Sequence, residues 1–246
     1  MHILLSNDDG FRAAGIQELA QAMLAFGQVT IVAPDGPRSG FSGAITTTHR
    51  TTEGNLAVYS CEGTPVDCVK LALNTLFVDQ RPDLIISGIN HGSNEGICVS
   101  YSGTLGAARE GCIYGIPSLA VSLDDTAWHP DFSDSIDYTV RVVKMMLEKP
   151  LPWQTMLSLN VPKTKPKGLK VCPMTVGRFV EEFVHSEDGR GKRIHWLTGR
   201  QDPAEDTKEA DWHYLKDGWA TLTPLQLDCT NYQWLGELEA LAERSA

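Results

Sequence analysis

The feature that most constrains the fold of this chain is an alternation of short apolar runs with longer stretches of helical period. The alternation extends over residues 1–162. The apolar runs lie at residues 2–5, 29–35, 56–61, 83–90, 118–123 and 156–162, and the helical stretches at 15–26, 64–77, 104–115 and 135–148. Continuous apolar strands separated by helices are typical of a parallel sheet covered on both faces. We therefore predict an α/β fold with a mostly parallel sheet.

Helix start signals support this prediction in the stretch at 64–77. Thr64 suits the N-cap position, Pro65 the first helical position, and Asp67 the first turn. In the stretch at 15–26, the apolar side chains recur on one helical face, which a helix packed on a sheet requires. That face consists of Ile16, Leu19, Ala20, Met23 and Leu24.

The last third of the chain has a different pattern. Short strand-like runs lie at 169–175, 193–199 and 218–227, and residues 200–217 form a polar stretch that we interpret as a loop. Residues 230–244 have the period of an amphipathic helix. We predict a catalytic α/β core over 1–162. We interpret residues 163–246, with a β-hairpin extension and a terminal helix, as an antiparallel extension of the same overall domain or an arm that packs on a partner subunit.

Charge and composition exclude several classes of protein. The formal net charge is −10, whereas binding a nucleic acid polymer requires a basic surface. No apolar run is long enough to cross a membrane, and the first ten residues lack the layout of a signal peptide. The six cysteines lack the spacing of a metal site. We expect a soluble, reduced, cytoplasmic protein.

Three glycine-containing loops follow strands of the predicted sheet. They are SNDDG at 6–10, PDGPRSG at 34–40 and GINHGSN at 88–94. Ligands of open parallel sheets bind beyond the carboxyl ends of the strands, so we expect these loops to converge at one edge.

Two adjacent aspartates in the first loop indicate a metal site. Asp8 and Asp9 can share a site only if the chain turns there, and Gly10 permits such a turn. Their carboxylates would repel each other unless a cation lay between them. Oxygen ligands suit Mg²⁺ or Mn²⁺ better than Zn²⁺, and Ser39 and Asn90 are candidate neutral ligands.

Simpler interpretations of these residues stay open from the sequence alone. Asp8 or Asp9 could cap the helix that starts near Gly15. Ser39 and Asn90 could each be an ordinary turn residue. The pairing of two aspartates after the first strand, together with similar loops downstream, favours the metal site.

A second motif, YSGT at 101–104, lies directly before a predicted helix. Free N–H groups at a helix start bind anions, although Ser102 or Thr104 could simply be an N-cap. The chain lacks the sequence patterns of a P-loop, a dinucleotide-binding turn and a hydrolase nucleophile elbow. A cation beside an anion cradle suits attack of water on a phosphate ester, with Asp8 and Asp9 acting through metal-bound water. The general base is not identified: His91 is nearest, and it could equally face solvent.

The chain resembles a known family. The motifs SNDDG, PRSG, GTPVDCV, SGINHGSN, YSGTLGAA, AVSL, NVP and TPL occur in the order and spacing of the SurE family (survival protein E), metal-dependent 5′/3′-nucleotidases. The match is tightest over residues 3–123. The resemblance implies a three-layer Rossmann-like domain with a mostly parallel sheet, plus a C-terminal antiparallel extension used in oligomerisation as a homodimer or homotetramer.

The resemblance also implies roles for individual residues. One divalent cation per subunit would be held by Asp8, Asp9, Ser39 and Asn90, and phosphate would contact Asn94, Ser102, Gly103 and Thr104. The implied substrates are nucleoside monophosphates. The alternatives are a broad phosphatase or exopolyphosphatase without nucleoside preference, and a metal-dependent nucleotide-binding regulator without turnover. The chain departs from the family at Ala14, where proline is common, and over 185–215, where no family pattern is evident.

Overall fold

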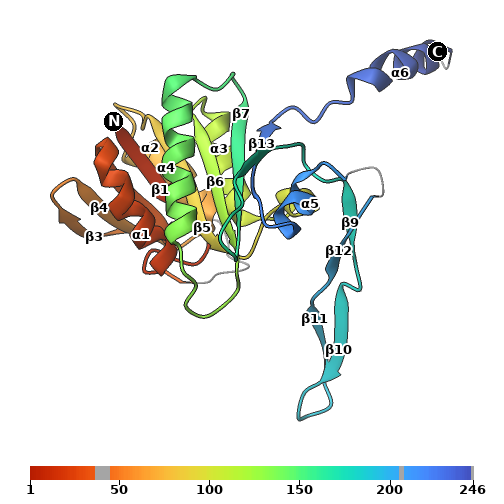
Figure 1. Ribbon diagram of the computed structural model, residues 1–246, viewed down its shortest axis with the longest axis horizontal. Helices are drawn as coiled ribbons and strands as arrows, with labels where there is room; N and C mark the ends of the chain where they lie inside the picture. The colour runs from red at the N-terminus through yellow and green to blue at the C-terminus, as the bar shows by residue number, and fades with distance from the viewer. Residues whose placement is uncertain (37–44, 205–207, 245–246) are drawn as a thin grey trace.

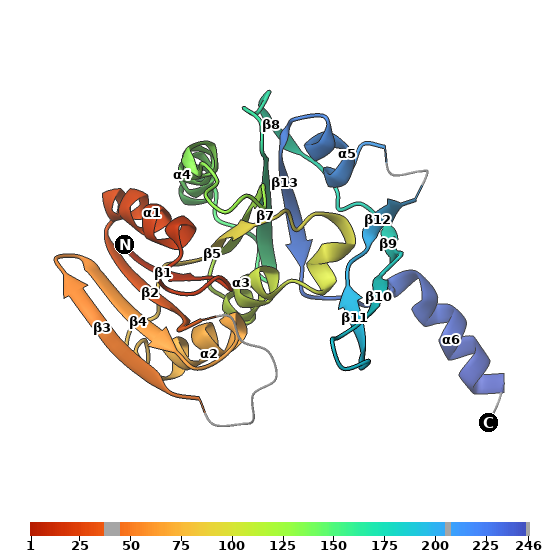
Figure 2. The ribbon, with the colours of Figure 1, turned by 90° about the horizontal axis from the view of Figure 1, so that it is seen from below.

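A nine-stranded sheet forms the centre of the molecule (Figures 1 and 2). The computed structural model describes residues 1–36, 45–204 and 208–244. In spatial order, the strands are β3 (Thr47–Glu53), β4 (Leu56–Cys61), β2 (Gln28–Pro34), β1 (His2–Ser6), β5 (Leu84–His91), β6 (Ser118–Asp124), β7 (Thr155–Pro162), β13 (Ala220–Gln226) and β8 (Leu169–Val171). The six strands from β4 to β7 are all parallel, whereas β3 is antiparallel to β4 and β13 to β7. The predicted mostly parallel sheet is confirmed.

Helices cover both faces of this sheet, as Figure 2 shows. On one face lie α1 (Ala14–Met23), which the short helix η1 (Leu24–Phe26) extends, and α4 (Ser133–Glu148); on the other lie α2 (Pro65–Thr75) and α3 (Gly103–Ile113). Thr64 caps α2, because its hydroxyl accepts the Asp67 N–H while the Asp67 carboxylate accepts the Thr64 N–H. The start signals in the sequence therefore located this helix correctly.

The central position of β1 explains why its sequence is apolar without interruption. Ile3 and Leu5 belong to the core beneath α1 and α4, whereas Leu4 between them belongs to the core beneath α2. All three side chains are fully buried. Successive side chains of a strand point to opposite faces, so a strand covered on both sides needs apolar residues at every position. Each such side chain contributes about 1.5–3 kcal/mol to folding.

The C-terminal segment has two parts. Its strands β8 and β13 extend the central sheet, and α5 (Asp211–Lys216) packs against β13. An arm extends away from the body (Figure 1) and contains two antiparallel pairs. One pair is β9 (Gly177–Val180) with β12 (Arg200–Pro203), and the other is β10 (Phe183–Glu187) with β11 (Arg193–Leu197). The helix α6 (Tyr232–Arg244) follows and has no buried residue.

The sequence interpretation differs from the structure at several elements, among them β9 and β10, which it did not identify. Residues 200–217, expected as a loop, contain β12 and α5. Six residues are too few to show a helical period, and α5 depends on burial of Ala210 and Leu215. The strand β3 was also missed. Its side chains are polar and mostly exposed because it is an edge strand, so hydrophobic periodicity gives no signal. None of the helices in the described part of the chain is long and apolar enough to span a membrane.

The strand β5 is irregular near its carboxyl end. Its register with β6 shifts between Ser87 and Asn90. Gly88 has φ +140°, and a Cβ atom there would lie 2.3 Å from the carbonyl oxygen of Val121. A glycine is therefore required for the two backbones to approach so closely.

We expect Gly88→Ala to lower the free energy of unfolding by about 2–3 kcal/mol, because the added methyl group meets a backbone carbonyl on β6 and the residue must hold a positive φ. Urea unfolding followed by circular dichroism measures this. Gly189→Ala is the matched control, since nothing lies within 4 Å of its added Cβ atom. Equal stability of the two variants would contradict this description of β5.

Candidate metal and phosphate site

A tight turn after β1 places the aspartate pair at the carboxyl edge of the sheet. Asn7 is fully buried, and its Nδ2 donates to the carbonyl oxygen of Gly10 (3.0 Å) while its Oδ1 accepts the Gly10 N–H (3.1 Å). Gly10 has φ +100°, which a glycine adopts without strain. The turn between them contains Asp8 and Asp9, as the sequence predicted. Asn7 itself was missed; a polar side chain at the end of an apolar strand was the available signal.

Asp8 lies against the N-terminus of α3. The hydroxyl of Thr104 donates to Asp8 Oδ1 (3.2 Å), and Asp8 Oδ2 lies 3.7 Å from the position of a Cβ atom on Gly103. Burial raises the pKa of the Asp8 carboxyl, and the hydrogen bond from Thr104 and the nearby imidazole of His91 partly oppose that rise. Two residues 96 positions apart in sequence thus meet at one carboxylate.

Asp9 is exposed at the surface beside Asp8. The pKa of Asp9 is raised, first because its carboxyl group loses part of its hydration on folding and second because of the charge of Asp8. The backbone N–H and the imidazole of His91 lower it. Neither aspartate caps the first helix, because Ala13 occupies the N-cap of α1 without a side-chain hydrogen bond. The capping interpretation of the pair is therefore excluded.

Asn90 is oriented by the loop that follows it. Its Nδ2 donates to the carbonyl oxygens of Gly92 (2.7 Å) and His91 (3.3 Å). Carbonyl oxygens only accept hydrogen bonds, so the amide orientation is determined and Oδ1 is its free end. Among the described residues, none donates a hydrogen bond to that oxygen. Ser39, the fourth predicted ligand, lies outside the described residues.

The oxygen atoms at this edge fit a hard divalent cation. Asp8 and Asp9 supply carboxylates whose pKa values are raised by loss of hydration and, for Asp9, also by the neighbouring charge. Asn90 offers a neutral oxygen, and such a set suits Mg²⁺ or Mn²⁺. Within residues 1–36, 45–204 and 208–244 there is no cluster of three His, Cys, Asp or Glu side chains that could hold a metal. A cation at this edge would therefore be held by two carboxylates together with neutral oxygens.

The predicted phosphate residues fall into two groups. Ser102 is the N-cap of α3, and its hydroxyl oxygen accepts the N–H of Leu105 (3.2 Å), so the capping interpretation of this residue is correct. The cap leaves the N–H groups of Gly103 and Thr104 at the helix start without helical partners, directly beside Asp8.

Asn94 belongs to a different set of contacts. Its Nδ2 donates to the hydroxyl of Ser122 (2.9 Å) and its backbone N–H to Asn160 Oδ1 (2.7 Å). We find no hydrogen bond between Asn94 and the other candidates in the described part of the chain. Ser122 and Asn160 anchor the loop after β5 to the ends of β6 and β7. The sequence analysis identified neither residue as functional, although each is a polar residue inside an apolar strand.

Glu95, the next residue in this loop, is a buried acid. It is 2% exposed, its Oε1 accepts from Gln201 Nε2 (3.3 Å), and its Oε2 atom is buried without a hydrogen-bond partner among the described residues. Burial raises the pKa of this carboxyl. Gln201 lies on β12, so this contact joins the arm to the loop.

Together, the fold and the site define a class: α/β proteins with a polar, acidic ligand site beyond the carboxyl ends of a parallel sheet. Comparison with known proteins narrows the class. The sequence profile described as Survival protein SurE matches residues 3–181. The chain belongs to the SurE family.

Three similar proteins illustrate the relationship. A protein of Porphyromonas gingivalis named 5′-nucleotidase SurE is 55% identical, covering 100% of this chain and 98% of its own length. Another of that name, from Phocaeicola vulgatus, is 45% identical, covering 96% of this chain and 95% of its own length. The crystal structure of the SurE protein from Aquifex aeolicus superposes with a TM-score of 0.81 at 32% identity, over 98% of this chain and 100% of that one.

We expect Glu95→Gln to stabilise the protein near neutral pH. Because burial raises the pKa of Glu95 in the folded state, ionisation favours the unfolded chain as pH rises above the unfolded value of about 4.5. The stability gained by Glu95→Gln should therefore grow as the pH rises above about 4.5, and it should vanish below about pH 4. Thermal unfolding measured from pH 3.5 to 8 tests this. Glu148→Gln, at an exposed position on α4, should show no such trend.

Proposed function

We propose that this protein is a metal-dependent phosphomonoester hydrolase that releases phosphate from nucleoside 5′- or 3′-monophosphates. The observation that carries the proposal is the contact between Asp8 and the N-terminus of α3, which sets candidate metal ligands beside candidate phosphate donors. The names of the relatives, 5′-nucleotidase SurE, support the choice of substrate.

In this proposal, Asp8, Asp9 and Asn90 hold one divalent cation per subunit, Mg²⁺ or Mn²⁺, with Ser39 as a further ligand. When bound, such a cation supplies a Lewis acid for the phosphoryl oxygens and makes a water molecule more acidic.

The residues of the chain itself orient the substrate. The N–H groups of Gly103 and Thr104 point out of the start of α3, where they would bind phosphoryl oxygens and stabilise charge that develops on them. The Thr104 hydroxyl keeps Asp8 in place, and the Asn7–Gly10 pair keeps the turn rigid. A site held in this way needs little rearrangement when the substrate binds. Asn94, hydrogen-bonded to Ser122 on β6 and Asn160 on β7, is proposed to contact the phosphate from the other end of the same loop.

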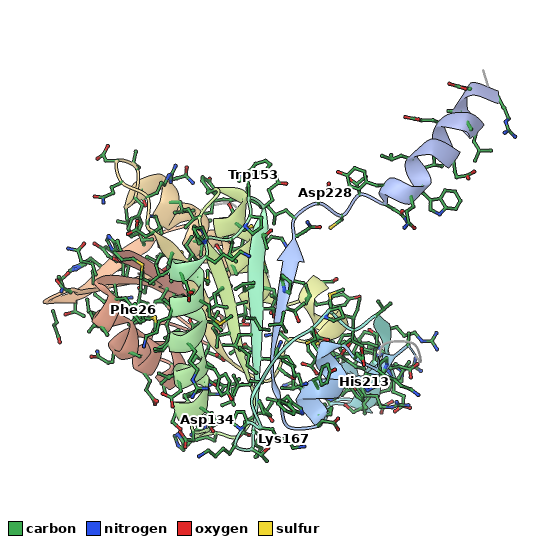
Figure 3. All side chains as sticks on the ribbon, turned by 45° about the horizontal axis from the view of Figure 1, so that its top comes forward. Phe26, Asp134, Trp153, Lys167, His213 and Asp228 are labelled. Atoms are coloured by element: carbon green, nitrogen blue, oxygen red, sulfur yellow. The ribbon has the colours of Figure 1, made fainter. Side chains whose placement is uncertain are left out.

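We further propose a homodimer or homotetramer. The helix α6 follows Asp228 and extends away from the body (Figure 3), and none of its residues is buried. Trp234, Leu235 and Leu238 are 55%, 44% and 53% exposed. An apolar helix face of this kind is stable in water when a second copy of the chain covers it.

The cytoplasm is the proposed compartment. All six cysteines lie in described residues and all are free thiols, which suits a reducing environment.

Asp8→Asn and Asp9→Asn should each lower metal-dependent phosphate release from AMP by roughly 10³-fold, because each removes a negative charge from the cation site. Circular dichroism should show an unchanged fold. Asp137→Asn, at an exposed position on α4, is the matched control and should retain full activity. Unchanged turnover by either of the first two variants would refute the proposed mechanism.

The double variant Leu235→Glu, Leu238→Glu should shift the protein toward monomer, since two charges then occupy the apolar face of α6. Light scattering after size-exclusion chromatography measures the mass. Glu237→Gln, which changes the same helix outside that apolar pair, should leave the mass unchanged. A double variant that keeps the wild-type mass would show that α6 is not part of the interface.

A further inference from the structure

A cavity of about 610 Å³ lies between the loop after β5, the arm and α5. Its walls include Ser93 and Glu95 from the loop, Phe179 and Gln201 from the arm, and Trp212 and Lys216 from α5. This volume is within the range of small-molecule sites, about 300–1,000 Å³.

Part of the cavity wall is close in sequence to residues of the candidate catalytic site. Gly92 and Ser93, which line it, follow Asn90 within three residues. At the far end of the same loop, the ring of Tyr101, the residue before Ser102, lies 5.9 Å from the ring of Phe179. The cavity therefore borders a loop whose two ends carry a candidate metal ligand and a candidate phosphate donor.

The charges in the cavity do not suit an extended polyanion. Lys216 pairs with Asp124 (3.1 Å) and Arg200 pairs with Glu181 (3.2 Å). Within the described lining of the cavity, Lys216 and Arg200 are therefore both already paired with carboxylates. A polyphosphate chain would have to break these ion pairs or approach the carboxylates directly.

The remaining features of the cavity suit a nucleobase. Phe179 and Trp212 offer aromatic rings, and a base stacks on such rings whatever its identity. Glu95 is almost fully buried, and its Oε2 atom has no hydrogen-bond partner among the residues that the structure describes. A buried oxygen of this kind is stabilised by an N–H donor, which amino-bearing bases present at their edge.

We infer that this cavity binds the nucleoside half of the substrate, with an amino-bearing base against Phe179 and Trp212 and its N–H edge toward Glu95. The inference rests on the proposed function and names its substrate class: monophosphates of amino-bearing nucleosides, in preference to polyphosphate or to sugar phosphates without a base. The arm, through Phe179 and Gln201, is then part of the specificity site.

The test compares AMP with ribose 5-phosphate, which carries the same sugar phosphate without the base. Wild-type protein in Mn²⁺ should have the higher kcat/KM for AMP. Trp212→Leu and Phe179→Leu should each reduce the AMP to ribose 5-phosphate ratio of kcat/KM about tenfold, mainly through KM for AMP, because stacking is lost. Adenosine should inhibit ribose 5-phosphate hydrolysis competitively, and about tenfold more weakly in both variants.

Trp153→Leu is the matched control. Trp153 precedes β7, at the opposite edge of the sheet from the carboxyl ends of the strands, and is 76% exposed (Figure 3, where it is labelled with His213, the neighbour of Trp212). This variant should keep the wild-type ratio and the wild-type inhibition by adenosine.

The possible outcomes are distinct. A ratio and an adenosine affinity that stay unchanged in both cavity variants would overturn the inference while leaving the proposed function intact. Absence of phosphate release from both substrates by the wild type would instead refute the proposed function. If Trp212→Leu disturbs α5 and lowers both activities equally, the AMP to ribose 5-phosphate ratio of Phe179→Leu, on the arm, decides whether the cavity binds the base.

Discussion

The contact between the Asp8 carboxylate and the start of α3 is the interaction on which the site depends. It joins the turn after β1 to the loop between β5 and α3, so the aspartate pair and the free N–H groups of a helix face the same space. The contact is possible because β1 and β5 are neighbouring parallel strands with their carboxyl ends at one edge. The Asn7–Gly10 pair then keeps both carboxylates at that edge despite their repulsion.

The C-terminal segment acts on the same loop from the other side. Asp211, which is 1% exposed, accepts the N–H groups of Gly96 (3.0 Å) and Thr175 (2.8 Å). Gly96 has φ +55°, and a Cβ atom there would lie 2.7 Å from Gln201 Oε1, so a side chain at this position would be strained and would displace the Gln201 side chain of the arm. The extension expected to serve contacts between subunits therefore also shapes the loop within one subunit, which is why a cavity forms between them.

Sequence reasoning succeeded where a residue's surroundings follow from its neighbours along the chain. The helix α2 is an example, since Thr64, Pro65 and Asp67 form its cap locally, and the helix begins where they predict. It failed for β3 and α5, because the first gains its strand conformation from pairing with β4 and the second from packing against β13. It also missed Asn7, Glu95 and Asp211, whose partners lie in backbone turns or distant segments.

By itself, the sequence determined the α/β class, most element positions and the three loops that contain candidate ligands, because hydrophobic period and turn chemistry are local properties. Only the tertiary structure decided which of those residues meet. Asp8 contacts Thr104 because a parallel sheet aligns strand ends that are far apart in sequence, whereas Asn94 is hydrogen-bonded to Ser122 on β6 and Asn160 on β7. The cavity beside Glu95 also required the fold, since its walls come from three separate segments that sequence spacing does not relate.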